Sequence, residues 1–134
     1  MRIVIDTNVL ISGVFFGGFP RKILSSVVTG EMTACATAEI VNEYEAVVQE
    51  MIDRKQGHIS KNILTPLITA LEIIEPVAQV DICRDLDDNK FLGCAKDSRS
   101  LYIVSGDKDL LVIEKFEKIQ ILTAKEFCEK YLSL

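Results

Sequence analysis

Carboxylates follow two of the most apolar segments of this 134-residue chain. Asp6 comes directly after the apolar run 3–5, and Asp107 and Asp109 come shortly after a second apolar run at 101–104. If both runs are parallel strands, their carboxyl ends meet at one edge of the sheet, where open α/β sheets bind ligands. Asp6 is also followed by apolar residues, and a charge in such surroundings needs a hydrogen-bond donor or a metal ion. A turn is the ordinary alternative for each of these aspartates.

A third acidic group stands at the start of an expected helix. Asp85, Asp87 and Asp88 precede the apolar residues Leu92 and Ala95. A single aspartate is enough to cap a helix, so three are more than a cap requires. Helical spacing places Asp88 on one face with Leu92 and Ala95, which predicts that Asp88 points inward. Asp85 and Asp87 are predicted to face solvent.

The clearest helix of the chain, at 38–52, carries acidic residues at both edges of its apolar stripe. Glu43 lies at one edge and Glu45 at the other. Periodicity alone does not choose between them, and a solvated helix face is the ordinary place of either.

Carboxylates that converge from different strand ends have one well-supported chemical use. Mg²⁺ and Mn²⁺ prefer oxygen ligands, often one or two carboxylates together with water and substrate phosphate. Such ions activate water and stabilise the leaving oxygen in phosphodiester hydrolysis. This chemistry needs neither histidine nor cysteine, which suits a chain whose one histidine is His58. The four cysteines form no CxxC pair, which argues against a zinc or redox site and predicts reduced thiols in or near the core: Cys35, Cys83, Cys94 and Cys128.

The composition predicts a compact acidic domain. Hydrophobic residues make up 49% and charged residues 26%, which is typical of a folded core rather than of disorder. With 15 basic against 20 acidic residues the net charge is −5, which excludes a basic coat for nucleic acid. A nucleic-acid enzyme is not excluded, because bound metal ions can supply positive charge. The length suits a single domain over residues 1–134.

Neither a membrane anchor nor an export signal is expected. The charge-free stretch 7–20 holds three glycines, ends in a proline and is shorter than the roughly 20 residues of a membrane span. Asp6 interrupts the apolar run near the N-terminus, which argues against a signal peptide. We therefore expect a cytoplasmic protein.

Strands and helices alternate along the chain, which predicts a three-layer α/β/α fold with a mainly parallel sheet. Segment 7–20 is expected to be largely loop because of its glycines, with a helix that starts at Pro20. Thr65 and Pro66 are expected to form the N-cap and first residue of another helix. The five expected strands are 2–5, 32–36, 77–82, 101–104 and 119–122, and the expected helices are 20–28, 38–52, 66–75, 87–95, 110–114 and 124–132.

The acidic segments resemble the motifs of PIN-domain nucleases, in order and in spacing, along nearly the whole chain. Run 3–12, which contains Asp6, resembles the opening strand and turn of the family. Glu43 stands where the family has its second acid, on a helix. Asp88 precedes the helix residue Ala95 by seven positions, as the acid of the third motif does.

Run 105–111 resembles the fourth motif, with Asp107 as the main acid and Asp109 as its neighbour. Ser105 stands where threonine is common, and it keeps a hydroxyl. The opening and fourth motifs together are quite specific, although either alone would be weak.

The resemblance implies a metal-dependent endoribonuclease with the sheet order 3-2-1-4-5. Small members of the family are often toxins of bacterial and archaeal toxin–antitoxin pairs of the VapC type, so an antitoxin partner is implied as well. Mg²⁺ or Mn²⁺ would be held, directly or through water, by Asp6, Glu43, Asp88 and Asp107, with Asp109 as a further or outer ligand. Polar groups of Thr7, Asn8 and Ser105 would hydrogen-bond these carboxylates or metal-bound water.

Four basic residues are candidates for contacts with RNA phosphates, and a solvated charge is at least as good an assignment for each: Arg21, Lys22, Lys90 and Lys108. Four apolar residues of the glycine-rich segment could form a homodimer or partner contact, or equally well pack in the core: Val14, Phe15, Phe16 and Phe19. Two rival functions stay open, a catalytically degenerate PIN fold that serves as a binding module and, last in rank, a phosphate-accepting receiver-like domain.

The four acids assigned by the resemblance suggest that part of the acidic excess is local. Two divalent cations at these acids would change the net charge from −5 to −1. We therefore expect RNA binding to depend on metal more than on lysine and arginine.

Overall fold

The computed structural model describes residues 1–54 and 61–132, so His58 lies outside the described residues. Within these ranges one sheet holds the strands β1 (Arg2–Ile5), β2 (Thr33–Ala36), β3 (Glu72–Ile73), β4 (Tyr102–Val104), β5 (Lys115–Phe116) and β6 (Ile119–Leu122). The helices are α1 (Thr7–Phe15), α2 (Gly18–Val28), α3 (Ala38–Asp53), α4 (Lys61–Ala70), α5 (Asn89–Ser98), α6 (Lys108–Leu111) and α7 (Ala124–Tyr131), and a 3₁₀ turn at Leu86–Asp88 precedes α5.

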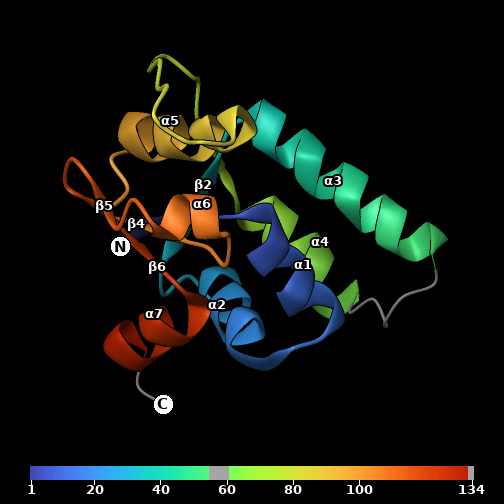
Figure 1. Cartoon of the computed structure of the whole chain (residues 1–134). Coiled ribbons are helices and arrows are strands. Elements are labelled where there is room, and N and C mark those ends of the chain that lie inside the picture. The colour runs from blue at the N-terminus through green and yellow to red at the C-terminus, as the bar shows by residue number, and fades with distance from the viewer. Residues whose placement is uncertain (55–60, 133–134) are drawn as a thin grey trace.

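The sheet has the order β3-β2-β1-β4-β6-β5, and its pairs are parallel except for the antiparallel β5–β6 edge. This confirms the predicted α/β class and the mainly parallel sheet, to which the short β5 adds a sixth strand. Central strand β1 is buried on both faces, which is why its sequence is a continuous apolar run. Helix α5 covers one side of the sheet, and α2 and α7 lie on the opposite side (Figure 1).

The prediction of a loop at 7–20 is wrong, because α1 and the first three residues of α2 occupy most of this segment. Gly13 does not break a helix but lets α1 pack closely on α2. A Cβ atom there would lie 2.6 Å from Leu24 Cδ1 and 3.1 Å from the backbone carbon of Pro20. Gly17, with a φ of 91°, makes the turn between the two helices.

Alanine at Gly13 should therefore destabilise the protein by about 1–3 kcal/mol, because the added methyl group overpacks the crossing of α1 and α2. The matched control is Gly93→Ala in α5, where the new Cβ would have an ordinary contact of 3.7 Å with the Ala78 carbonyl oxygen. That variant should gain about 0.5–1 kcal/mol, because alanine has the higher helix propensity. Urea unfolding of both variants measures the two changes, and equal values would contradict the packing argument.

The prediction of a strand at 77–82 is also wrong, because β3 at Glu72–Ile73 is the strand that pairs with β2. No strand forms in the stretch between β3 and the 3₁₀ turn, all of which is described. Its backbone N–H groups donate instead to two side chains of α5 at 2.7–3.1 Å, those of Val77 and Ala78 to Asp97 and those of Ile82 and Cys83 to Asn89. Amides that are bonded to side chains cannot pair with a neighbouring strand.

Two helix boundaries also differ from those expected. Helix α4 begins at Lys61, whereas the sequence predicted Thr65 as the N-cap and Pro66 as the first helical residue, so Pro66 lies inside the helix. Ile63 and Leu67, four residues apart, are both buried, so packing of one face holds the helix across the proline. Helix α6 begins at Lys108, earlier than expected, because the Asp107 side chain caps it.

The core contains the four cysteines, which are all buried and without a disulfide, as predicted. Tyr102 of β4 packs edge-on against Phe127 of α7 with ring centroids 5.7 Å apart. Among the helices described, none combines the length and the apolar character that crossing a bilayer requires.

Candidate active site

Asp6 lies at the carboxyl end of β1, where it is 4% exposed. The parallel register pairs Ile5 with Val104, so Asp6 and Ser105 leave the sheet side by side. The Ser105 hydroxyl donates to Asp6 Oδ2 at 2.7 Å and accepts from the Asp107 N–H at 2.9 Å. One buried hydroxyl therefore connects the first acid with the fourth.

Burial raises the pKa of Asp6 above its ordinary value. The hydrogen bond from Ser105 lowers it, and the negative charge of Asp107 raises it further. The carboxylate is thus held in place by neutral donors, the Ser105 hydroxyl and the Thr7 backbone, while the like charge of Asp107 stands next to it, which favours the approach of a cation.

Asp107 is half-buried and caps α6 by accepting the Asp109 N–H at Oδ1, at 2.8 Å. This Asx turn fixes both aspartates after β4. Asp109 forms an ion pair of 2.8 Å with Arg84, whose side chain is exposed. A surface pair of this kind contributes little stability and can open to admit another cation.

Asp88 ends the 3₁₀ turn and points inward, with 7% of its surface exposed. Its Oδ2 atom is buried and has no hydrogen-bond partner among the described residues. Burial is the largest cause, and the charges of Asp107 and Asp85 add to it, so that the pKa of Asp88 is raised from 3.8 to about 7. A buried carboxylate without a donor fits a metal ligand, because a cation would supply the missing partner.

Asp85 also lies close to Asp88 and Asp109, although sequence patterns predicted only a helix cap or a solvent-facing position for it. One carboxylate oxygen each of Asp85, Asp88 and Asp109 lies within 4.8 Å of the other two. Asp85 is exposed, as expected, and its Oδ1 accepts the Asp87 N–H at 3.1 Å. The available signal was its place in the same acidic run as Asp88, but only the fold brings Asp109 beside it.

Glu43 reaches the acids from α3. The neighbouring Tyr44 is buried and donates its hydroxyl to the Ile5 carbonyl, which anchors α3 on β1. Thr7 donates its hydroxyl to Glu43 Oε2, and Lys90 forms an ion pair of 2.8 Å with Oε1. Glu45 is exposed on the other edge of the helix, so the structure places Glu43, and not Glu45, next to the residues that flank Asp6.

The expected phosphate contacts have different surroundings. Arg21 donates to the carbonyls of Gly13 and Val14 and so closes the end of α1. Lys22 is exposed on α2, where its amine lies 5.5 Å from the centre of the Phe19 ring. Lys90 is nearly buried between carboxylates, whereas Lys108 is exposed directly beside Asp107.

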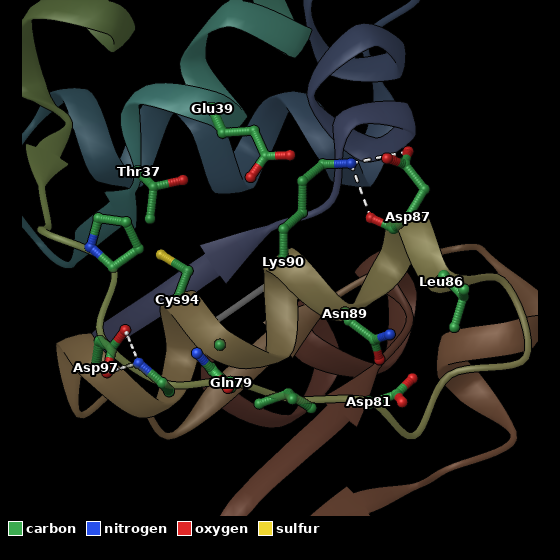
Figure 2. A pocket seen from close by; sticks show the side chains of 14 residues that line it. Thr37, Glu39, Gln79, Asp81, Leu86, Asp87, Asn89, Lys90, Cys94 and Asp97 are labelled. Atoms are coloured by element: carbon green, nitrogen blue, oxygen red, sulfur yellow. Dashed lines mark hydrogen bonds and ion pairs between the residues drawn. The ribbon is translucent and has the colours of Figure 1, made fainter.

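Two hollows flank the acids. Exposed Asn8, together with Ser105 and Gly106, lines a small groove of about 200 Å³. A larger groove of about 560 Å³ lies between the start of α3, α5 and residues 76–81. Figure 2 shows Lys90 at the edge of this larger groove, where its amine reaches Asp87.

Residues 2–109 match the model of the PIN domain, and this range contains every one of the acids described above. The chain belongs to the PIN-domain family. PIN domains are generally nucleases that use divalent metals, and the acidic cluster of this PIN domain could bind one. Membership therefore indicates a nuclease-type fold and a nucleic-acid substrate.

This PIN domain is similar to the uncharacterized protein MJ1680 of Methanocaldococcus jannaschii. The two are 32% identical over 143 aligned positions, which cover 98% of this chain and 92% of the relative. No solved structure matches the chain. The comparisons thus show the family. The substrate and the metal ligands have to be inferred from the chemistry of the site.

Proposed function

We propose that this PIN domain is a metal-dependent endoribonuclease that hydrolyses RNA phosphodiester bonds. The observation that carries the proposal is the buried Oδ2 atom of Asp88, which has no hydrogen-bond partner in residues 1–54 and 61–132 and lies among carboxylates from other elements. Such an atom is costly in an apoprotein and has a clear use in a metal-loaded one.

Four acids would hold Mg²⁺ or Mn²⁺, directly or through water: Asp6, Glu43, Asp88 and Asp107. Asp109 would be a further or outer ligand. Asp85 is added to this role because its carboxylate lies within 4.8 Å of oxygens of Asp88 and Asp109. When bound, the metal would supply an activated water and stabilise the departing oxygen. Ser105 orients Asp6 and the start of the Asp107 turn, and Thr7 orients Glu43.

RNA would approach the site along its exposed margin. Lys108 and Asn8 are both exposed next to the acids and could contact phosphate or ribose. Lys22 stays a candidate phosphate contact farther away, whereas Arg21 is engaged with main-chain carbonyls. Because few cations line the acidic edge, RNA affinity should depend mainly on bound metal.

The proposed biological role is that of a toxin in a cytoplasmic toxin–antitoxin pair, and the chain is proposed to act as a homodimer. Val14 and Phe15 are buried and belong to the core, whereas Phe16 is 67% exposed. Phe16 thus supports a partner contact of the kind expected for the glycine-rich segment. A neighbouring reading frame for a small DNA-binding protein would support the pairing, and a monomer at micromolar concentration would contradict the homodimer.

A cleavage assay on several RNAs tests the activity. Cleavage should need Mg²⁺ or Mn²⁺ and should stop in EDTA. Glu43→Gln should lower the rate about 10-fold or more, which is the size of effect seen when groups that orient metal ligands are changed. The matched control Glu45→Gln changes an exposed residue of the same helix and should leave the rate unchanged.

Cleavage that survives EDTA would contradict the metal-dependent mechanism. A protein that binds Mn²⁺ poorly and cleaves none of the RNAs would instead favour the degenerate binding module. The unaltered acids of this chain argue against that alternative.

A further inference from the structure

Lys90 is a nearly buried cation inside the acidic site. Its amine lies 2.8 Å from Glu43 Oε1, 2.8 Å from Asp87 Oδ2 and 2.8 Å from the Asp87 carbonyl oxygen. These three acceptors use all three N–H donors of the ammonium group. The side chain is 9% exposed, so the amine has neither a spare donor nor free access for a phosphate.

The acids of the site fall into two groups, Glu43 next to the Lys90 amine and the aspartates away from it, and the two groups differ in how far their negative charge is neutralised. In the first group, both oxygens of Glu43 have partners, one the Lys90 ammonium and the other the Thr7 hydroxyl. In the second group, Asp6 accepts one neutral hydroxyl, and Asp88 Oδ2 has no partner among the described residues. Positive charge is thus supplied to Glu43, whereas among the described residues no ion pair reaches Asp6 or Asp88, and Asp109 is paired with the exposed Arg84.

We propose that Lys90 takes the place of a second metal ion, so that the site binds one divalent ion, held by the aspartates. The inference deepens the proposed metal-dependent function and rests on it. Glu43 then acts as a positioning residue that holds Lys90 and Thr7, rather than as a direct ligand.

A second ion at Glu43 would have to displace the ammonium group. Close approach of two cations is strongly unfavourable where water is mostly excluded. Movement of Lys90 would also break three short contacts at once and leave Asp87 without its cation. Figure 2 shows the stem of Lys90 rising from α5 with its amine at Asp87, a position fixed by the helix rather than by a loop.

Titration calorimetry with Mn²⁺ alone tests the inference on the metal-free protein. The wild type should bind one ion, and Lys90→Arg, which keeps the charge, should also bind one. Lys90→Met should bind two, since Glu43 is then unneutralised. Electron paramagnetic resonance should show coupling between two Mn²⁺ ions in that variant only.

The matched control is Lys108→Met, which removes one positive charge beside the acids. Lys108 is exposed, and among the described residues it is Lys90, not Lys108, that forms the ion pair with Glu43. The Lys108→Met variant should bind one ion, as the wild type does. Glu43→Gln should also keep one ion with its Kd changed less than threefold, even though its cleavage rate falls.

Several results would overturn the inference. Two ions in the wild type, or an unchanged single ion in a folded Lys90→Met, would show that Lys90 does not replace a metal. If Lys90→Met does not fold, the stoichiometry of the wild type and of Glu43→Gln decides. Absence of any Mn²⁺ binding by the wild type would overturn the proposed function itself, which distinguishes the two failures.

Discussion

Asparagine in place of Asp88 is expected to weaken Mn²⁺ binding and RNA cleavage by about 100-fold or more, since loss of an outer partner alone costs 10–100-fold. The substitution keeps the shape of the side chain but removes the charge of the one buried carboxylate that has an unpartnered oxygen among the described residues. Calorimetry with Mn²⁺ and a cleavage assay at saturating metal measure the two effects separately.

Asp81→Asn is the control for this variant, because Asp81 is exposed in the segment that precedes the acidic turn. It should behave as the wild type does. Asp85→Asn gives additional information, since Asp85 lies within 4.8 Å of the Asp88 and Asp109 oxygens but outside the four acids assigned by resemblance. Unchanged Mn²⁺ affinity in Asp88→Asn would remove the main support for a metal site here.

The metal-free protein should lose stability as the pH rises from about 5 to about 7. Asp88 has its pKa raised from 3.8 to about 7 by burial and by nearby acids, and burial raises that of Asp6 as well. In this pH window the folded state holds more protons than the unfolded state, so the free energy of unfolding falls as protons are lost. The expected fall is on the order of a few kcal/mol, and the curve should be flat above about pH 8.

Urea unfolding in EDTA at several pH values measures this trend. Asp88→Asn should flatten the slope, because it removes the group that must ionise while buried. Saturating Mn²⁺ should reverse the slope, since the metal binds ionised carboxylates and competes with protons. The ion pair with Arg2 lowers the pKa of Glu72 below its ordinary value of 4.5. Glu72 therefore changes stability only below about pH 4.5 and does not contribute to the slope between about pH 5 and 7. An equal slope in wild type and Asp88→Asn would contradict the assignment.

Local sequence patterns predicted the elements whose buried face follows from the periodicity of their apolar residues. The apolar run of β1 and the spaced apolar residues of α3 each have one good solution, a buried central strand and an amphipathic helix. The glycines of 7–20 were misleading, because Gly13 is needed for a contact with Leu24, which sequence spacing does not reveal. The absent strand at 77–82 has a similar cause, since its amides find Asn89 and Asp97 on a later helix.

The same distinction holds for the acidic site. The inward direction of Asp88 followed from helical spacing, and the meeting of Asp6 with the 105–109 turn followed from the rule for parallel sheets. Periodicity did not choose between Glu43 and Glu45, and the resemblance to a family did. The Lys90 contact with Glu43 joins two helices distant in sequence, so no local pattern could predict it.

The side-chain bonds of α5 to the segment after β3 have a consequence for how the protein opens. Asn89 directly follows Asp88, and its oxygen holds the amides of Ile82 and Cys83. A stretch without regular structure therefore belongs to the same cooperative unit as the start of α5, and the two should fray or close together. Binding of a metal ion that orders Asp88 would therefore also order residues 77–83. Because these residues form one side of the larger groove, metal binding at the acids would change the shape of that groove without a hinge motion.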